Sequence, residues 1–73
     1  LRKLAEEFAD TEYEPLMQHH LGMAFYETRD FRAAVTRFTL ALEQRQAINA
    51  PKHLVDASRI CLQMAEQRLQ ASA

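Results

Sequence analysis

The sequence contains very little cysteine, glycine and proline, and no tryptophan: one Cys, one Gly, two Pro and no Trp in 73 residues. A single cysteine cannot form an internal disulfide, which favours a reducing compartment and predicts a cytoplasmic location. Because the one glycine is Gly22, the chain has no glycine-rich phosphate-binding loop. Gly and Pro are the poorest helix formers, so their scarcity, with much Ala, Leu, Gln, Glu and Arg, predicts an all-α fold.

An excess of charge of one sign is also missing. Nine Lys and Arg stand against ten Asp and Glu, for a formal net charge of −1. That balance offers no basic surface for DNA or RNA. The longest uninterrupted apolar run, residues 21–26, is too short to span a bilayer. We therefore expect no nucleic-acid partner and no membrane partner.

The length of the chain limits its function as well. Seventy-three residues make one domain at most, residues 1–73, and a chain of this size buries only about 60% of its unfolded surface. Its stability should therefore need neighbours, a dimer or very regular packing. We expect no self-contained enzyme, no catalytic residue and no cofactor. The chain begins at Leu1, without Met and already in a helical pattern, so we expect a fragment of a longer protein.

Three short breaks interrupt the helical pattern, at residues 10–15, 28–30 and 49–51. In the first, Thr11 and Glu14 have the spacing of a capping box, in which each side chain accepts a hydrogen bond from the other's backbone N–H. This spacing predicts that a helix begins there, with the first residues of the chain forming the end of an earlier helix and a loop, residues 1–13.

The other two breaks carry their own start and stop signals. Asp30 is a favourable N-cap, Asn49 can end a helix, and Pro51 suits the first position of the next one. The predicted helices are Arg2–Ala9, Glu14–Thr28, Phe31–Ile48 and Pro51–Gln70.

The predicted helices differ in how their apolar residues are distributed. Helix Phe31–Ile48 has one apolar stripe: Phe31, Ala34, Val35, Phe38, Ala41 and Leu42. Helix Glu14–Thr28 has two, Met17, Leu21, Ala24 and Phe25 on one side and Leu16, Met23 and Tyr26 on the other. The last helix has a broad apolar arc. We expect the helix with two stripes to contact two different neighbours.

Residues 15–48 resemble one tetratricopeptide repeat (TPR), whose signature is matched by Leu21, Gly22, Phe25, Ala34, Phe38, Ala41 and Leu42. The resemblance implies an antiparallel helix pair over residues 14–48, closest where Gly22 lacks a side chain, with Phe25 and Phe38 filling the remaining space. Gln18 and Gln46 depart from the pattern, which has a large residue and a proline there. Residues 51–70 are then either the first helix of a next repeat or a capping helix.

The resemblance also implies a function, that of an adaptor or scaffold that binds a peptide or a partner helix on its concave face. The positions that correspond to that groove are Leu16, His19, Met23, Tyr26, Glu27, Arg59 and Leu62. Repeats that bind acidic C-termini have Lys and Asn at the positions of His19 and Met23, so that specificity is not expected. The same apolar residues would equally suit packing on another helix.

Two further roles remain open from the sequence. The helix at 51–70 would form a homodimer if Val55, Leu62 and Leu69 met the same residues of a second copy. Alternatively, the chain would be a regulatory adaptor segment of a larger protein.

Metal or thiol chemistry is not expected. Adjacent residues of a helix point about 100° apart, so His19 and His20 cannot bind one metal ion together. Cys61 lies at the centre of an apolar arc, where a small buried thiol is the ordinary interpretation. We predict neither a metal site nor a catalytic cysteine.

Overall fold

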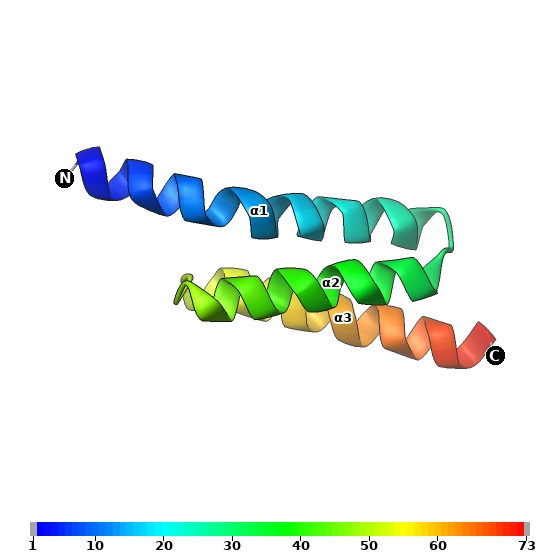
Figure 1. The fold of residues 1–73 in the computed structure, drawn as a ribbon. Helices are drawn as coiled ribbons and strands as arrows, with labels where there is room; N and C mark the ends of the chain where they lie inside the picture. The colour runs from blue at the N-terminus through cyan, green and yellow to red at the C-terminus, as the bar shows by residue number, and fades with distance from the viewer. Residues whose placement is uncertain (1, 73) are drawn as a thin grey trace.

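A computed structural model describes the backbone of residues 2–72 and the side chains of residues 12–72. It contains three helices: α1 (Arg2–Glu27), α2 (Phe31–Ala47) and α3 (Lys52–Ser72). Successive helices run antiparallel, so α1 and α3 point in the same direction (Figure 1). Over the described residues the chain is all-α, as predicted.

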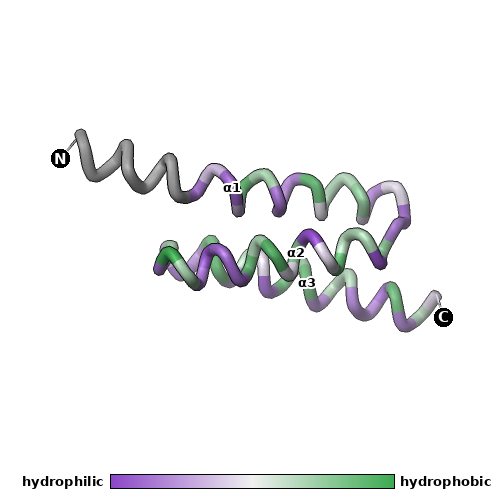
Figure 2. The backbone as a smooth tube through the Cα atoms, viewed as in Figure 1, coloured by the Kyte–Doolittle hydropathy of each residue, from purple (hydrophilic) through white to green (hydrophobic). Residues whose placement is uncertain are grey.

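The middle helix holds the fold together. α2 packs along both α1 and α3, whereas α1 and α3 touch each other at few points. The result is an elongated body of 48 × 18 × 14 Å. Hydrophobic and hydrophilic residues alternate along every described helix (Figure 2), which is the pattern of helices that each bury one side.

The predicted break at residues 10–15 is wrong, because α1 continues through it as one helix. Thr11 and Glu14 therefore lie inside a helix and do not begin one. Proline in a helix interior removes one backbone hydrogen bond and costs about 3 kcal/mol. Here Pro15 is less than 2% exposed, and the burial of its ring offsets part of that cost. The side chains of the predicted helix Arg2–Ala9 lie outside the described residues.

The two turns follow the predicted signals. The Asp30 carboxylate accepts a hydrogen bond from the Ala33 N–H at 3.2 Å and caps α2. Arg29 and Asn49 end the preceding helices with φ of 66° and 54°, the left-handed conformation common just past a helix end. Asn adopts it more readily than Arg does. α3 begins directly after Pro51.

The core is small and centres on α2. Ala34 and Phe38 of α2 and Ala65 of α3 form its buried cluster. A Cβ atom placed on Gly22 would lie 2.7 Å from Cδ1 and Cε1 of Phe38. The close approach expected between the first two helices at Gly22 is therefore present, and Phe25 packs against the same cluster.

Candidate functional site

An apolar hollow of about 180 Å³ lies between α1 and α3. Its lining residues are Met23, Tyr26 and Glu27 from α1, Phe38 from α2, and Cys61 and Met64 from α3. Phe38 is only 2% exposed and so lies deepest, whereas Met23 and Met64 are 42% and 47% exposed. The hollow therefore has a rigid aromatic base with flexible thioether side chains at its edges.

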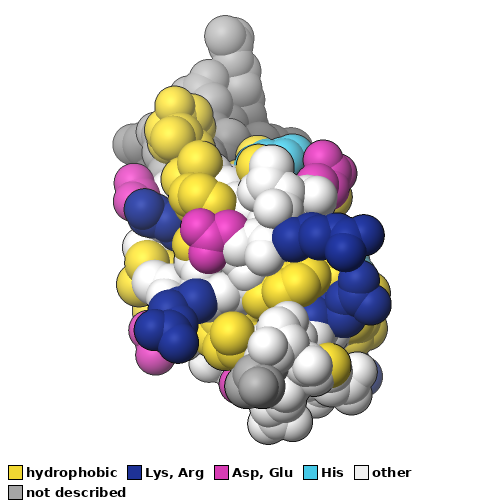
Figure 3. Space-filling view, turned by 90° about the vertical axis from the view of Figure 1, so that its right-hand side faces the viewer, with side chains coloured by type: hydrophobic (Ala, Val, Ile, Leu, Met, Phe, Trp, Pro, Cys, Tyr) yellow, Lys and Arg dark blue, Asp and Glu magenta, His cyan; other side chains and the backbone are white. Residues whose placement is uncertain are grey.

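Aromatic and cation–π contacts hold Tyr26, which lines the hollow, in place. The Tyr26 ring meets the Phe31 ring edge to face, with centroids 5.3 Å apart, and the Arg68 guanidinium lies 5.4 Å from the Phe31 centroid. Viewed from the end of the molecule that carries the α1–α2 turn, hydrophobic side chains reach the surface between basic and acidic ones (Figure 3). Apolar surface at this end of the molecule is therefore bordered by side chains of both charges.

Cys61 contributes a thiol to the hollow. It is half-buried and free. Burial raises the pKa of the thiol, and the positive charge of Arg45 opposes that rise only in part. Cys61 is accordingly a protonated, weakly polar part of the lining rather than a reactive thiolate.

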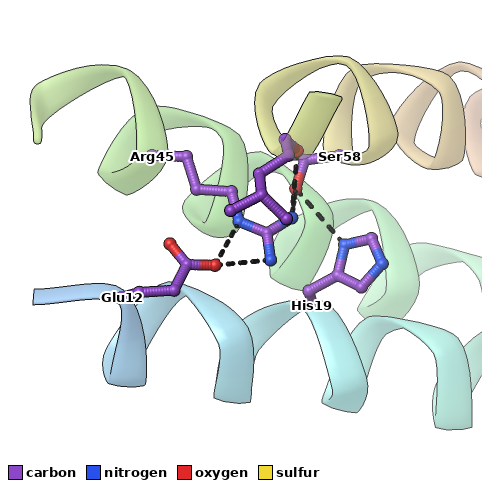
Figure 4. Close-up of polar contacts among 5 residues, drawn as sticks. Glu12, His19, Arg45 and Ser58 are labelled. Atoms are coloured by element: carbon purple, nitrogen blue, oxygen red, sulfur yellow. Dashed lines mark hydrogen bonds and ion pairs between the residues drawn. The ribbon is translucent and has the colours of Figure 1, made fainter. Parts of the chain in front are cut away.

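A buried polar network lies beside the hollow and joins all three helices (Figure 4). Arg45 of α2 is 2% exposed. Its Nε and Nη2 contact Glu12 Oε1 at 2.9 and 2.7 Å. Its Nη1 donates to Ser58 Oγ at 2.8 Å and to the Leu54 carbonyl at 3.0 Å. One guanidinium therefore bridges α1 and α3.

His19 extends this network toward the hollow. Its Nδ1 lies 3.2 Å from Ser58 Oγ, and its ring meets that of Phe38 edge to face at 5.4 Å. Burial lowers the pKa of His19, the charges of Arg45 and His20 lower it further, and Glu12 opposes them. Since the ordinary value is 6.5, His19 is neutral at physiological pH.

Within the part of the chain that the structure describes, the network leaves one buried carboxylate oxygen without a hydrogen bond, which is energetically costly. Glu12 Oε2 is buried and accepts no hydrogen bond from the described residues. A buried ion pair contributes little net stability, yet removing one partner leaves the other charge buried and costs several kcal/mol. Replacing Arg45 or Glu12 alone is therefore expected to cost more than the pair contributes to stability.

Only part of the predicted groove comes together. Met23, Tyr26 and Glu27 line the hollow, and His19 lies next to it in the polar network. Leu16 faces the other side of α1.

On α3, the two predicted groove residues are elsewhere. Arg59 is exposed and pairs with Asp56 at 3.1 Å, while Leu62 packs against the core cluster. The small residues Ser58 and Ala65, both 0% exposed, face α2. α3 is therefore rotated about its axis relative to the prediction, so that Cys61 and Met64 line the hollow beside α1 and Arg59 and Leu62 do not.

Sequence reasoning missed Arg45, although a signal for it existed. The buried stripe of α2 consists of Phe31, Ala34, Phe38, Ala41 and Arg45, at steps of three and four residues. A charged residue at the next position of an apolar stripe indicates a buried partner on another helix. The partner, Glu12, is 33 positions away, and nothing in the sequence pairs the two.

The outward side of α1 carries a second apolar surface, which we call the outer face. It is a shallow depression of about 290 Å³ formed by Tyr13, Leu16, Met17, His20 and Leu21. Tyr13 is 64% exposed and Leu21 37%, so Leu21, one of the repeat-signature residues, is not enclosed by the helix pair. The two predicted apolar stripes are each divided between the two sides of the helix. Met17 and Leu21 of one stripe and Leu16 of the other lie on the outer face, whereas Phe25 and Tyr26, one from each stripe, pack against the core cluster.

Among the side chains that the structure describes, no three His, Cys, Asp or Glu residues converge as metal ligands. Within the same part of the chain, no helix has the length and apolarity needed to cross a bilayer. No family model, no curated protein and no solved structure matches this chain.

Proposed function

We propose that the chain is a TPR-like, non-catalytic interaction module that binds an apolar peptide segment or partner helix in the hollow between α1 and α3. The observation that carries this proposal is the hollow itself, an apolar space between two helices that run in the same direction. Flexible methionine side chains such as Met23 and Met64 adapt to varied apolar groups, and methionine-rich surfaces are common where proteins bind helices.

The charge of the hollow narrows the chemistry of the partner. Glu27 is the charged residue among those that line it. A partner with apolar side chains spaced by three or four residues and a Lys or Arg beside them would fill the space and pair with that carboxylate.

The helix arrangement supports the repeat interpretation. Gly22 against Phe38 is the contact that the resemblance implies, and α3 packs along α2 as either the first helix of a next repeat or a capping helix would. The single free cysteine fits a cytoplasmic location.

The three methionines provide a matched experiment. Met64 is 47% exposed at the hollow, and Met17 is 44% exposed on the outer face. We would select binders from a displayed random-peptide library on the wild-type chain, with the Met64→Lys variant as the counter-selection. The affinity of an enriched synthetic peptide should fall about tenfold or more with Met64→Lys.

Met17→Lys is the control, and it should leave the affinity within about twofold of wild type. The proposal is wrong if no peptide is enriched over the counter-selection, or if Met17→Lys weakens binding as much as Met64→Lys does.

A second candidate function is self-association, favoured by the outer face. The residues first expected to pair in a dimer are half-buried within one chain: Val55, Leu62 and Leu69. They therefore present little exposed apolar surface to a second copy. Pairing through the outer face instead would cover Tyr13 and Met17. Sedimentation velocity would then show a dimer that Met17→Lys dissociates and Met64→Lys does not. Either role suits a segment of a larger protein.

A further inference from the structure

The hydrogen bonds of the buried network have a direction. A serine hydroxyl donates one proton and accepts through its lone pairs. Arg45 Nη1 can only donate, and it lies 2.8 Å from Ser58 Oγ, so the hydroxyl accepts there. His19 Nδ1 lies 3.2 Å from the same oxygen. The serine proton is then free to point at His19 Nδ1, and we assign this arrangement to the neutral imidazole, with its own proton on Nε2.

This chain of hydrogen bonds crosses the three helices in the order α2, α3, α1. It lies where α1 and α3 otherwise have few contacts, and Phe38, which His19 contacts, also lines the hollow. We propose that the Arg45–Ser58–His19 chain is a proton-sensitive latch, which holds α3 against α1 and so sets the width of the hollow. Its effect on binding rests on the function proposed above.

Protonation of His19 reverses one link of the latch. Nδ1 then becomes a donor and points at Ser58 Oγ, which already accepts from Arg45. The serine proton must then turn away from His19, and the imidazolium and the Arg45 guanidinium place two positive charges around the fully buried Ser58. Two like charges repel where water is largely excluded, so the protonated state favours separation of α3 from α1.

The charged groups around His19 shift its pKa in both directions. On α1, His20 is 6.4 Å away between ring centroids, and Glu12 also influences the imidazole. On α2, Arg45 is the nearby cation. From α3, the described contact is the uncharged Ser58 hydroxyl. Arg45 and His20 disfavour a charged imidazole and Glu12 favours it, with burial as the largest influence.

The free chain tests the latch without any partner. With ¹³C at the methionine ε-methyl groups, NMR spectra from about pH 8 to about pH 5 should show the Met23 and Met64 signals moving together. Their midpoint should lie below 6.5, and His19→Gln should abolish the movement. His20→Gln is the matched control and should retain it. Signals that stay fixed, or that titrate equally in His19→Gln, overturn the latch.

If His19→Gln does not fold, Ser58→Ala is the second variant. It removes the hydroxyl while the imidazole remains, so the pH-dependent movement of Met64 should be lost although His19 still titrates. Retention of that movement overturns the latch.

Binding of the selected peptide then tests the coupling to the hollow. Affinity should fall about tenfold between about pH 7.5 and about pH 5 in the wild type and less than about twofold in His19→Gln. If the methyl signals titrate while the affinity stays constant, the latch does not control binding in the hollow, and that part of the proposal is wrong. Methyl signals that titrate in a chain that binds no peptide at any pH refute the proposed function and support the latch.

Discussion

α1 meets its two neighbouring helices in opposite ways. Against α2 it places Gly22 so close to Phe38 that even a methyl group does not fit. Against α3 its direct hydrogen bond joins His19 to Ser58, Arg45 of α2 bridges the two helices, and an apolar hollow stays open beside these contacts. Close apolar packing allows only one geometry, because any added volume causes steric strain. Directional polar contacts can hold a helix at a distance and leave space for a ligand.

The largest expected effect comes from filling the α1–α2 contact. Gly22→Leu should destabilise the chain by about 3 kcal/mol or more through overpacking, enough to unfold a domain of this size. Gly22→Ala is the sharper variant. In an exposed helix it would gain about 1 kcal/mol, but here it should lower the free energy of unfolding in urea.

A second substitution separates overpacking from other effects of Gly22→Ala. In a Phe38→Leu background the smaller side chain vacates part of the space, so Gly22→Ala should cost less than it does alone. Equal costs in the two backgrounds, or a stabilised Gly22→Ala, would contradict the close contact.

Breaking the polar junction should have the next largest effect. Arg45→Met leaves the Glu12 carboxylate buried and unpaired, which should lower the free energy of unfolding by about 3 kcal/mol. Adding Glu12→Gln removes that charge and should recover part of the loss. Urea unfolding of the four chains of this double-mutant cycle measures the coupling, and additive effects would show that the two residues do not interact.

The pH dependence of stability is a smaller effect with a definite sign. Because the pKa of His19 is lowered in the folded chain, the unfolded chain takes up this proton first as pH falls. The free energy of unfolding should therefore decline from about pH 6.5 down to the lowered pKa, and His19 should contribute no slope above that window. Urea melts of His19→Gln should lack this decline, and an unchanged profile would contradict the assignment.

The smallest effects on stability should come from the two exposed methionines. Met64→Lys and Met17→Lys should each change the free energy of unfolding by no more than about 0.5 kcal/mol. Thermal melts check this. A large loss in Met64→Lys would mean that the hollow is part of the core and not a site.

The sequence was sufficient for features that depend on neighbouring positions along the chain. The Asp30 cap and the stripe of α2 follow from residue type and local periodicity, and the close approach at Gly22 is what the resemblance to the repeat implied. The break predicted at residues 10–15 failed because the burial of Pro15 depends on tertiary contacts that the local pattern does not contain.

The residues that line the hollow, the candidate site, were predicted only in part, for a related reason. The orientation of α3 about its axis places Ser58 against Arg45 and Ala65 in the core cluster, which are contacts with another helix. Helical periodicity shows that α3 has a broad apolar arc, but it does not show which part of that arc faces α1. The sequence therefore did not predict that Cys61 and Met64 line the hollow, or that Arg59 and Leu62 lie outside it.

The most direct test of the binding account compares the three methionine ε-methyl signals during a titration with the selected peptide. Met23 and Met64 line the hollow, and Met17 lies on the outer face. If the peptide binds in the hollow, the Met23 and Met64 signals should shift with one saturable dissociation constant while the Met17 signal stays in place. A titration that moves Met17 and leaves the other two unchanged would contradict it.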